Sequence, residues 1–382
     1  MTRSVSTAPV ADLTRYLPEN LQPQPHVKLV TKYESLDEQE AVDVANETHT
    51  VGLVPSDVPL RLVNSEQGAR VPAGLHIPWG IQAVRADRTN LSGKGVKLAL
   101  LDSGINREHA AFHGLEIKFK NFTDEDNSAY WDHGTHCASI AFGQNVDGQR
   151  IGIARGIEQA IVGKVVHSRH NDHSDASVLV DALQWAAKAG AEVISLSVAQ
   201  DYAKYFTGLK RQGYGTAEAI SLVLQGYRDS LQLFEGVANI LFSTRPDPPI
   251  VIAAAGNQSA TGAAIHTTLP ADIEGIVSVA ALQQTATGPY RLAPFSNVST
   301  DLAAPGTDII GANASGGLVC KSGTSMAAPY VAGVTALWIE KLRHNQRNAR
   351  TNRVKQALLG RASQTRSLHS AVNAGLVHAP SD

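Results

Sequence analysis

Continuous apolar runs and helical repeats of apolar residues alternate along most of the chain. Five runs rich in Val, Ile, Leu and Ala are typical of strands buried on both faces: residues 96–101, 160–166, 192–198, 250–255 and 275–280. Apolar side chains at helical spacing predict helices at 176–189 and at 330–342. Strands that alternate with helices indicate an α/β fold of three layers, in which helices flank a mostly parallel sheet.

The N-terminal part of the chain follows a different pattern. Residues 1–25 are polar and contain four prolines, which predicts a flexible arm. Residues 26–64 predict a small β-α-β extension, with a short acidic helix at 36–46 and strands at 26–31, 48–54 and 58–63. A linker reaching residue 74 follows, so we expect the main domain at 75–382.

Composition and charge exclude several classes of function. The chain has 382 residues, of which 43% are hydrophobic and 18% are charged. Its 33 basic and 35 acidic residues give a net charge of −2, which argues against nucleic-acid binding and against intrinsic disorder. Two cysteines cannot build a disulfide framework or a zinc site. Because no apolar run has the length of a secretory signal core or a membrane span, we expect a cytoplasmic protein with no membrane partner.

Three short segments carry residues suited to nucleophilic catalysis. Asp102 follows the apolar run at 96–101, His133 lies in the segment Asp-His-Gly-Thr-His, and Ser325 lies in Gly-Thr-Ser-Met-Ala before a helical run. A serine hydroxyl becomes a strong nucleophile only when a base removes its proton, and a carboxylate fixes the tautomer of that base. Each residue alone has an ordinary explanation as a cap or turn residue. Together they predict a catalytic triad of Asp102, His133 and Ser325.

The three segments resemble the motifs of the subtilisin-like serine proteases, or subtilases. Those motifs are Asp-Ser/Thr-Gly, His-Gly-Thr-His and Gly-Thr-Ser-Met-Ala, and they occur here unbroken and in the order known for this family. The resemblance extends over residues 77–342. It implies a subtilisin-like fold and a serine endopeptidase of peptidase family S8 that hydrolyses protein or peptide substrates.

The resemblance also implies an oxyanion hole and a substrate-binding region. Asn257 is similar to the family's oxyanion donor, with the backbone amide of Ser325 as the second donor, although a turn asparagine after a buried strand has the same pattern. The implied substrate-binding residues are Ser197, Val198 and Ala199 on one wall, Ala254, Ala255 and Gly256 on the opposite wall, and Val166 and His167 at a further peptide-binding edge. Many relatives have Leu-Gly-Gly where this chain has Val198, Ala199 and Gln200, so the family's specificity does not carry over.

The sequence departs from the family at its calcium sites. The tight calcium of secreted subtilisins is expected to be absent, because Leu75 and Ala111 stand where two of its side-chain ligands would be. Asn145 or Asp147 leaves a weaker calcium site open. We expect no other metal and no cofactor.

Two further groups of residues have alternative interpretations. Cys137, close to His133 in the sequence, is either a small buried side chain or a redox-sensitive thiol. A histidine-rich stretch is either a solvated loop or a transition-metal site, and its members are His167, His170, Asp172, His173 and Asp175.

An insertion at about 201–249 separates Ser197 from Asn257, and we predict a loop at 201–215 followed by a helix at 216–242. In one interpretation the helix packs on the core. In the other, the loop with Tyr202, Tyr205 and Phe206 forms a lid or exosite beside the substrate pocket.

The region at 26–74 resembles the inhibitory propeptide of subtilase precursors. We therefore expect part of residues 1–74 to cover the cleft of a zymogen, with this segment as an internal inhibitory partner. Two alternatives to a hydrolytic protease stay open. One is a maturation protease or macrocyclase acting on a specific precursor peptide, and the other is an inactive relative used only for binding.

Overall fold

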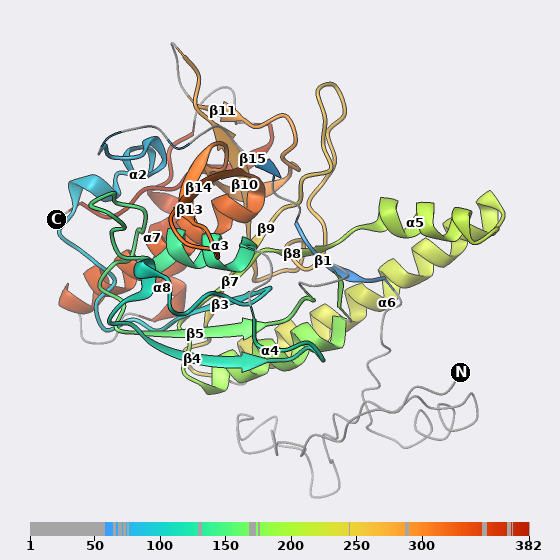
Figure 1. Ribbon diagram of the computed structural model, residues 1–382. Helices are drawn as coiled ribbons and strands as arrows, with labels where there is room; N and C mark the ends of the chain where they lie inside the picture. Colours follow the sequence, from blue (N-terminus) through green and yellow to red (C-terminus); the bar gives the residue numbers. More distant parts are fainter. Residues whose placement is uncertain are drawn as a thin grey trace, which may run out of the picture.

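The chain folds around one large sheet, shown with its flanking helices in the computed structural model of Figure 1. The structure describes residues 58–63, 66–67, 71, 74, 76–128, 132–167, 173–174, 176–243, 245–286, 290–345, 350–364, 368 and 370–381. The predicted arm at 1–25 and most of the predicted β-α-β extension lie outside the described residues. Leu75, His170, Asp172 and Asp175 lie outside them as well.

Within the described residues, the central sheet has the strand order β15-β12-β10-β9-β7-β3-β5-β4, and every pairing along this path is parallel. β11 (Arg291–Leu292) adds an antiparallel partner to β10. The five predicted strands are confirmed, since they overlap β3, β5, β7, β9 and β10. The path strands are β3 (Leu98–Asp102), β4 (Glu116–Asn121), β5 (Gln159–Lys164), β7 (Val193–Leu196), β9 (Ile250–Ala254), β10 (Val277–Gln283), β12 (Thr300–Pro305) and β15 (Val372–Leu376).

The side chains of the central strands point alternately into two separate hydrophobic clusters. In β3, Leu98 and Leu100 belong to the first cluster, whereas Ala99 and Leu101 belong to the second. The first cluster includes residues of α3 (His133–Phe142), α7 (Thr324–Asn345) and α8 (Thr351–Gly360), and the second includes residues of α4 (Ala176–Lys188) and α6 (Thr216–Ser243). A strand with apolar residues on both faces needs cover on both sides, which confirms the three-layer prediction.

Two small sheets stand apart from the central sheet. β1 (Leu60–Leu62) lies between β6 (His173–Ser174) and β8 (Val198–Gln200), and it is antiparallel to both. β2 (Glu66–Gln67) pairs antiparallel with β14 (Leu318–Ser322), which also pairs with β13 (Ile309–Ala312). The N-terminal segment therefore contributes one strand to each small sheet.

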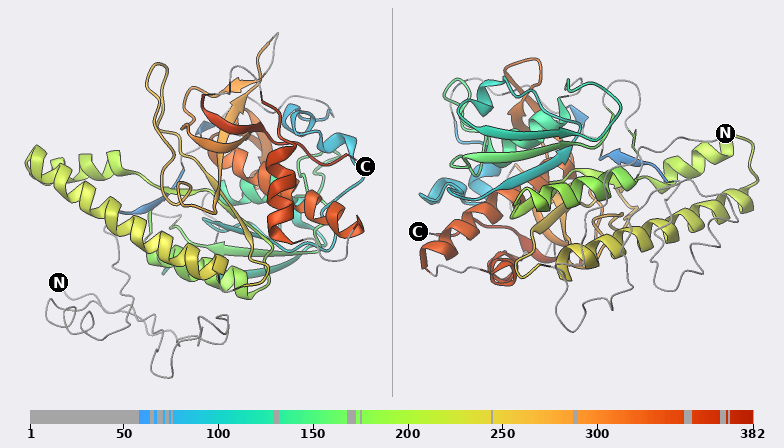
Figure 2. Two further views of the ribbon diagram at one scale, coloured as in Figure 1. Left: turned by 180° about the vertical axis from the view of Figure 1, so that it is seen from behind. Right: turned by 90° about the horizontal axis from the view of Figure 1, so that it is seen from below.

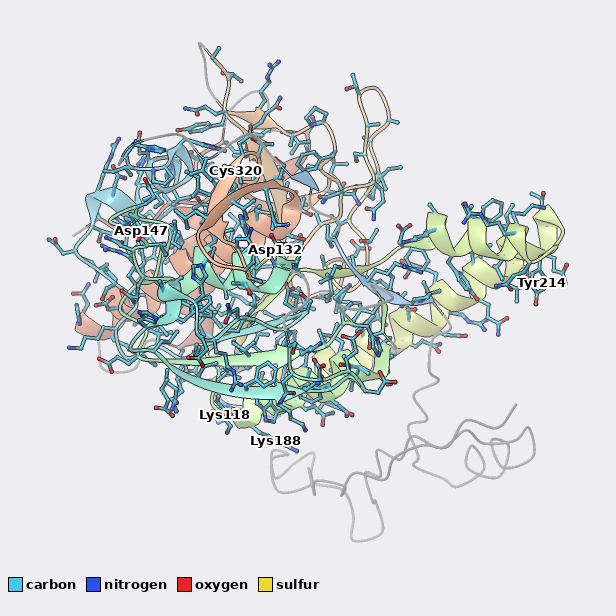
Figure 3. The ribbon with its side chains drawn as sticks, in the orientation of Figure 1. Lys118, Asp132, Asp147, Lys188, Tyr214 and Cys320 are labelled. Carbon is cyan, nitrogen blue, oxygen red and sulfur yellow. The ribbon has the colours of Figure 1, made fainter. Side chains whose placement is uncertain are left out.

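The insertion forms a helical hairpin that projects from the rest of the molecule (Figures 1 and 2). The predicted loop at 201–215 is wrong for most of its length, because α5 (Tyr202–Arg211) begins directly after Asp201. The Asp201 carboxylate accepts a hydrogen bond from the Lys204 backbone N–H at 2.9 Å, which caps this helix. α5 packs along the N-terminal half of α6, and Tyr214 between them marks the far tip of the hairpin (Figure 3).

The predicted helix at 216–242 is confirmed as α6, but only its C-terminal half packs on the core. Phe234, Val237 and Leu241 are buried there. Near the tip, Ile220 is 46% exposed and Leu224 is 63% exposed. The apolar stripe predicted this helix correctly. The sequence pattern alone could not show that the helix extends beyond the edge of the core, so that the apolar residues near the tip stay exposed.

The remaining short elements are α2 (Trp79–Ala83) and the 3-10 helices η3 (Ala86–Arg88) and η4 (Ala110–Phe112). Among the described residues, none of the helices has the length and apolar character needed to cross a bilayer.

Candidate active site

Three elements bring Asp102, His133 and Ser325 to one edge of the central sheet. Asp102 is the last residue of β3, His133 is the first residue of α3, and Ser325 lies in the first turn of α7. Parallel strands present their carboxyl ends at the same edge, where helices and loops that follow them can converge. All three residues are buried, with His133 at 4% exposure and the other two at 0%.

Asp102 and His133 form a direct hydrogen-bonded pair. Nδ1 of His133 donates to Oδ1 of Asp102 at 2.8 Å, and the same oxygen accepts from the Ser103 backbone N–H at 2.7 Å and the Ser103 hydroxyl at 3.2 Å. Burial, the largest single effect, disfavours the imidazolium, yet the charge and hydrogen bond of Asp102, together with a smaller effect of Cys137, hold the pKa of His133 well above its ordinary value. Within the described residues, the opposite ring nitrogen, Nε2, is buried and has no hydrogen-bond partner.

The backbone of Ser325 is fixed, while its hydroxyl faces a peptide carbonyl. The Ser325 carbonyl oxygen accepts from the Ser197 hydroxyl at 3.1 Å and from the Cys137 thiol at 3.3 Å. The Ser325 hydroxyl donates to the backbone oxygen of Val63 at 2.7 Å. No hydrogen bond between Ser325 and His133 occurs among the described contacts, so the structure joins Ser325 to the N-terminal segment and not to the imidazole.

The segment that meets Ser325 runs through the site as an extended strand. Val63 N–H donates to the Ser197 backbone oxygen at 3.1 Å. Upstream of it, the register pairs Leu62 with Val198, Arg61 with Ala199 and Leu60 with Gln200. The predicted wall at Ser197, Val198 and Ala199 is thus brought against β1.

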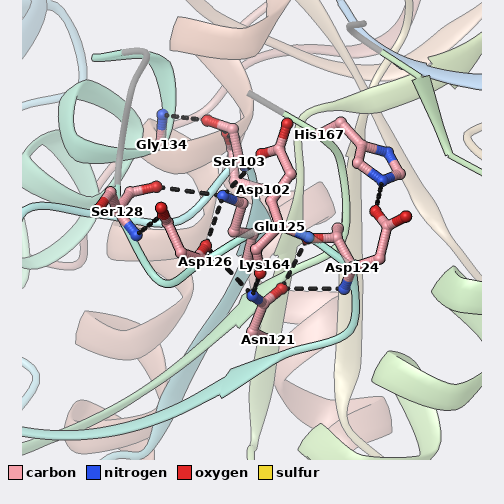
Figure 4. Close-up of polar contacts among 11 residues, drawn as sticks. Asp102, Ser103, Asn121, Asp124, Glu125, Asp126, Ser128, Gly134, Lys164 and His167 are labelled. Carbon is pink, nitrogen blue, oxygen red and sulfur yellow. Dashed lines mark hydrogen bonds and ion pairs between the residues drawn. The ribbon is translucent and has the colours of Figure 1, made fainter. Parts of the chain in front are cut away.

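The strand on the other side of β1 is β6, and not the segment with Val166 and His167 that the sequence predicted as the second peptide-binding edge. β6 pairs with β1, whereas Val166 and His167, expected at this edge, form no pairing with it among the described residues. Val166 is buried in the second hydrophobic cluster, and the His167 ring contacts the Asp124 carboxylate (Figure 4). The chain after β5 first turns toward the loop that follows β4, so the edge strand forms further along the sequence.

Asn257 lies just after β9 and contacts Thr324, the residue before Ser325. Its Oδ1 accepts from both the backbone N–H and the hydroxyl of Thr324, each at 2.9 Å. These two donors fix which end of the side-chain amide is oxygen, so the NH₂ group is the end directed elsewhere. Gly256, which has a φ of 110°, makes the turn between the strand and Asn257. The predicted wall residues Ala254 and Ala255 are both fully buried.

A buried lysine beside Asp102 was not anticipated from the sequence. Lys164 of β5 is paired in register with Asp102 of β3, but its Nζ points to the loop after β4 (Figure 4). There Nζ lies 2.9 Å from Oε2 of Glu125 and donates to the backbone oxygens of Asp126 and Ser128 at 3.0 and 3.1 Å. A charged residue inside the otherwise apolar run at 160–166 was the available signal.

The second histidine of the His-Gly-Thr-His motif has a structural position. The His136 ring lies between the backbone oxygens of Ile309 and Val319, with Nε2 at 3.0 and 3.2 Å from them. Burial lowers the pKa of His136 to about 3, so the ring is neutral and donates one proton. His136 thereby ties α3 to the β13–β14 hairpin that precedes Ser325.

The triad pair also lies in a cluster of metal-ligand types. Among the described residues, ligand atoms of Asp102, His133 and Cys137 lie within 4.8 Å of one another. Two features favour the hydrogen-bonded pair over a metal site. Nδ1 of His133 is already engaged with Asp102, and burial raises the pKa of the Cys137 thiol, which disfavours the thiolate that binds metals. The metal interpretation of the histidine-rich stretch falls largely on residues outside those described and stays a prediction.

Comparison with known proteins agrees with this geometry. The model of the subtilase family matches residues 93–376. A thermophilic serine proteinase from Bacillus sp. (strain AK1) is 31% identical over 255 residues, which are 66% of this chain and 54% of that protein.

Two further relatives are covered over more of their length. An intracellular serine protease from Paenibacillus polymyxa is 28% identical over 73% of this chain and 76% of its own length. The major intracellular serine protease of Bacillus subtilis is 27% identical over 73% of this chain and 80% of its own length. A family match that spans most of the chain, together with these relatives, means that the chain belongs to the subtilase family.

Proposed function

We propose that this chain is a serine endopeptidase that hydrolyses peptide bonds through Asp102, His133 and Ser325. The Ser325 oxygen attacks the substrate carbonyl carbon, and Nε2 of His133 takes up the hydroxyl proton. His133 then gives that proton to the leaving amine, and a water molecule repeats the sequence to release the acid. Supporting this, Nε2 is buried without another partner in the described part of the chain, which leaves it as the acceptor for the Ser325 proton.

Asp102 is proposed to hold His133 in the required tautomer. Because Nδ1 of His133 donates to Asp102, the lone pair of the neutral ring lies on Nε2, the nitrogen that must act as a base. The same carboxylate stabilises the imidazolium once the proton has arrived. Three hydrogen bonds on a single oxygen keep the carboxylate from rotating.

The oxyanion is proposed to form between the side-chain amide of Asn257 and the backbone N–H of Ser325. Thr324 orients Asn257 through its oxygen, so the NH₂ end of the amide is held in a fixed direction as a preorganised donor. The position of Ser325 in the first turn of α7 adds the positive end of a long helix.

The observation that carries the proposal is the contact between the Ser325 hydroxyl and the carbonyl oxygen of Val63, at 2.7 Å. Val63 is held at the same time by the Ser197 backbone oxygen, in an extended strand. A carbonyl presented to the nucleophile within a paired strand is the arrangement a peptide substrate requires. We therefore propose that residues 58–63 cover the cleft of a zymogen, and that Ser325 cleaves the bond between Val63 and Asn64.

The residue before the cleaved bond is proposed to be small and apolar. Val63 is 3% exposed and belongs to the same hydrophobic cluster as Ala199 and Ala254, one from each predicted pocket wall. Side chains on Ala199 and Gln200, where many relatives have glycines, leave less room for a large group.

We further propose that the catalytic domain spans residues 75–382 and is preceded by this inhibitory region. Its substrates are proposed to be proteins or peptides. A cytoplasmic location is proposed because two relatives are named intracellular proteases. We also propose that the domain lacks the tight calcium site of secreted subtilisins, since Ala111 offers no side-chain oxygen at one of its ligand positions.

Intact mass after treatment with a fluorophosphonate tests the proposed nucleophile. One adduct on the wild-type chain and none on Ser325→Ala is expected, with kcat lower by ~10⁶ in the variant. An adduct on both chains would contradict the assignment of Ser325. No adduct on a wild-type chain whose mass shows that the N-terminal segment has been removed would favour the binding-only alternative, whereas no adduct on a full-length chain means a blocked zymogen or an inert triad. The masses of products from a peptide substrate separate hydrolysis from ligation, because a ligated or cyclised product lacks the added mass of water.

A further inference from the structure

The inserted hairpin is continuous with the strand that holds β1. Gln200 is the last residue of β8, and Asp201 caps α5, which starts at the next position. Counting back from Val63 as the first residue before the cleaved bond, Leu60 is the fourth and Val58 is the sixth. The beginning of β1 thus lies where β8 gives way to the insertion.

Gln200 contacts the main chain of the sixth residue. Its side-chain NH₂ donates to the backbone oxygen of Val58 at 2.8 Å, and its Oε1 accepts from the Tyr202 hydroxyl at 2.6 Å. Gln200 is fully buried, where an amide that lacked these partners would be unfavourable. Tyr202, the first residue of α5, also packs edge-on against Tyr227 of α6, with ring centroids 5.5 Å apart. The insertion therefore orients the amide that binds Val58.

The side chain of Val58 rests directly on α6. A Cβ built on Gly226 would lie 2.5 Å from Cγ2 of Val58 and 3.8 Å from Cε1 of Tyr205. Gly226 lies inside a helix of 28 residues and has no left-handed φ, so local backbone geometry gives no reason for a glycine there. Glycine weakens a helix interior, and the close approach of Val58 is the feature that requires it.

We propose that the α5–α6 hairpin forms a distal binding subsite for the sixth residue on the N-terminal side of the cleaved bond. Gln200 binds the main-chain carbonyl of that residue, and the surface at Gly226 and Tyr205 accepts a small apolar side chain. The subsite rests on the proposed endopeptidase function and adds a specificity to it. It selects peptides that bind in an extended conformation and have an apolar side chain at the sixth residue before the cleaved bond. Tyr202 is a positioning residue that acts through Gln200.

Peptide length tests the subsite. Two acylated aminocoumarin substrates, Val-Pro-Leu-Arg-Leu-Val and Leu-Arg-Leu-Val, differ only in the residues that reach it. The expected kcat/KM of the longer peptide is at least about tenfold higher, from one hydrogen bond and the burial of one valine. Any remaining N-terminal segment lowers the concentration of open cleft equally for both peptides, so the ratio does not depend on whether the chain has been cut.

A matched pair of glycine variants separates the subsite from general effects. Gly226→Ala places a methyl group against the sixth residue and should lower kcat/KM for the longer peptide about tenfold. It should leave the shorter peptide unchanged, as well as a longer peptide that begins with glycine. Gly208→Ala in α5 is the control, because nothing lies within 4 Å of its new methyl group. Both changes favour helix formation, so neither is expected to prevent folding.

Gln200→Glu keeps the acceptor for Tyr202 and removes the donor to the substrate. It should lower kcat/KM for both six-residue peptides and spare the four-residue one, and Tyr202→Phe should do the same more weakly. A purely structural role for either residue would lower all three activities together. Equal hydrolysis of the long and short peptides by the wild-type chain would overturn the subsite alone. Failure of the wild-type chain to hydrolyse any of them faster than Ser325→Ala would overturn the proposed function as well.

Discussion

Replacing Asp102 by asparagine removes one charge from the site at nearly constant shape. Oδ1 of Asp102 accepts three hydrogen bonds, while Oδ2 is buried without a partner among the described residues. An asparagine that keeps its oxygen at the Oδ1 position buries an unpaired NH₂ group, at a cost of about 1–3 kcal/mol. An asparagine that turns over directs NH₂ at His133 and moves the ring proton to Nε2, which removes the base.

Both orientations lower activity. We expect kcat to fall by ~10⁴, equivalent to about 5 kcal/mol of transition-state stabilisation. The pH dependence of kcat/KM should change as well, and the structure predicts the direction of that change. Burial works against the charged imidazole, but Asp102 holds the pKa of His133 well above its ordinary value, so the neutral base accumulates only as pH rises through that pKa. Without the carboxylate the pKa falls, and the acidic limb of kcat/KM should move to lower pH.

The assay is kcat/KM for the four-residue aminocoumarin peptide between pH 5 and 10. Asp132→Asn is the matched control, because Asp132 adjoins His133 in sequence but pairs with Lys321 at 2.8 Å. The control should keep the position of the acidic limb. A kcat for Asp102→Asn within tenfold of wild type, or an acidic limb that stays in place or moves to higher pH, would refute the reasoning.

Three further changes have defined outcomes. Asn257→Ala should lower kcat by ~10²–10³ with little change in KM, and a main effect on KM would place Asn257 in ground-state binding instead. Leu60→Ala, made in the Ser325→Ala chain, should lower the free energy of unfolding by about 2–5 kcal/mol and the melting temperature by several degrees, because Leu60 is fully buried in β1. An unchanged melting temperature would mean that β1 is not docked in solution. Gly311→Ala should cost about 1–3 kcal/mol in chemical unfolding relative to Gly208→Ala, since its methyl group would lie 2.7 Å from the His136 ring. Equal stability of those two variants would show that the ring can move aside.

The central strands could be read from the sequence because their burial on both faces leaves an unbroken apolar run. β3 and β9 are predicted for this reason. β4 escaped prediction because one of its faces is exposed, so its charged residues, such as Lys118 and Lys120, interrupt the run. α5 escaped because its capping residue, Asp201, lies in a stretch whose polar residues suggest a loop.

For the site, the sequence motifs predicted that Asp102, His133 and Ser325 lie near one another and that part of residues 1–74 covers the cleft, but not which residue contacts Ser325. Asp102, His133 and Ser325 are brought to one edge by strand and helix ends, as expected. The contact between Ser325 and Val63 joins residues far apart in the chain and depends on the pairing of β1 with β8. Such a pairing leaves no periodic signal in a three-residue strand, and the same limit explains why β6 was not anticipated as its other neighbour.

The most direct test of the account is the intact mass and N-terminal sequence of the purified wild-type chain beside Ser325→Ala. The account predicts a wild-type product that begins at Asn64 and a Ser325→Ala chain that stays whole at 40.5 kDa. Cleavage of both chains at the same bond, or a wild-type product that begins elsewhere, would contradict the placement of Val63 at the nucleophile.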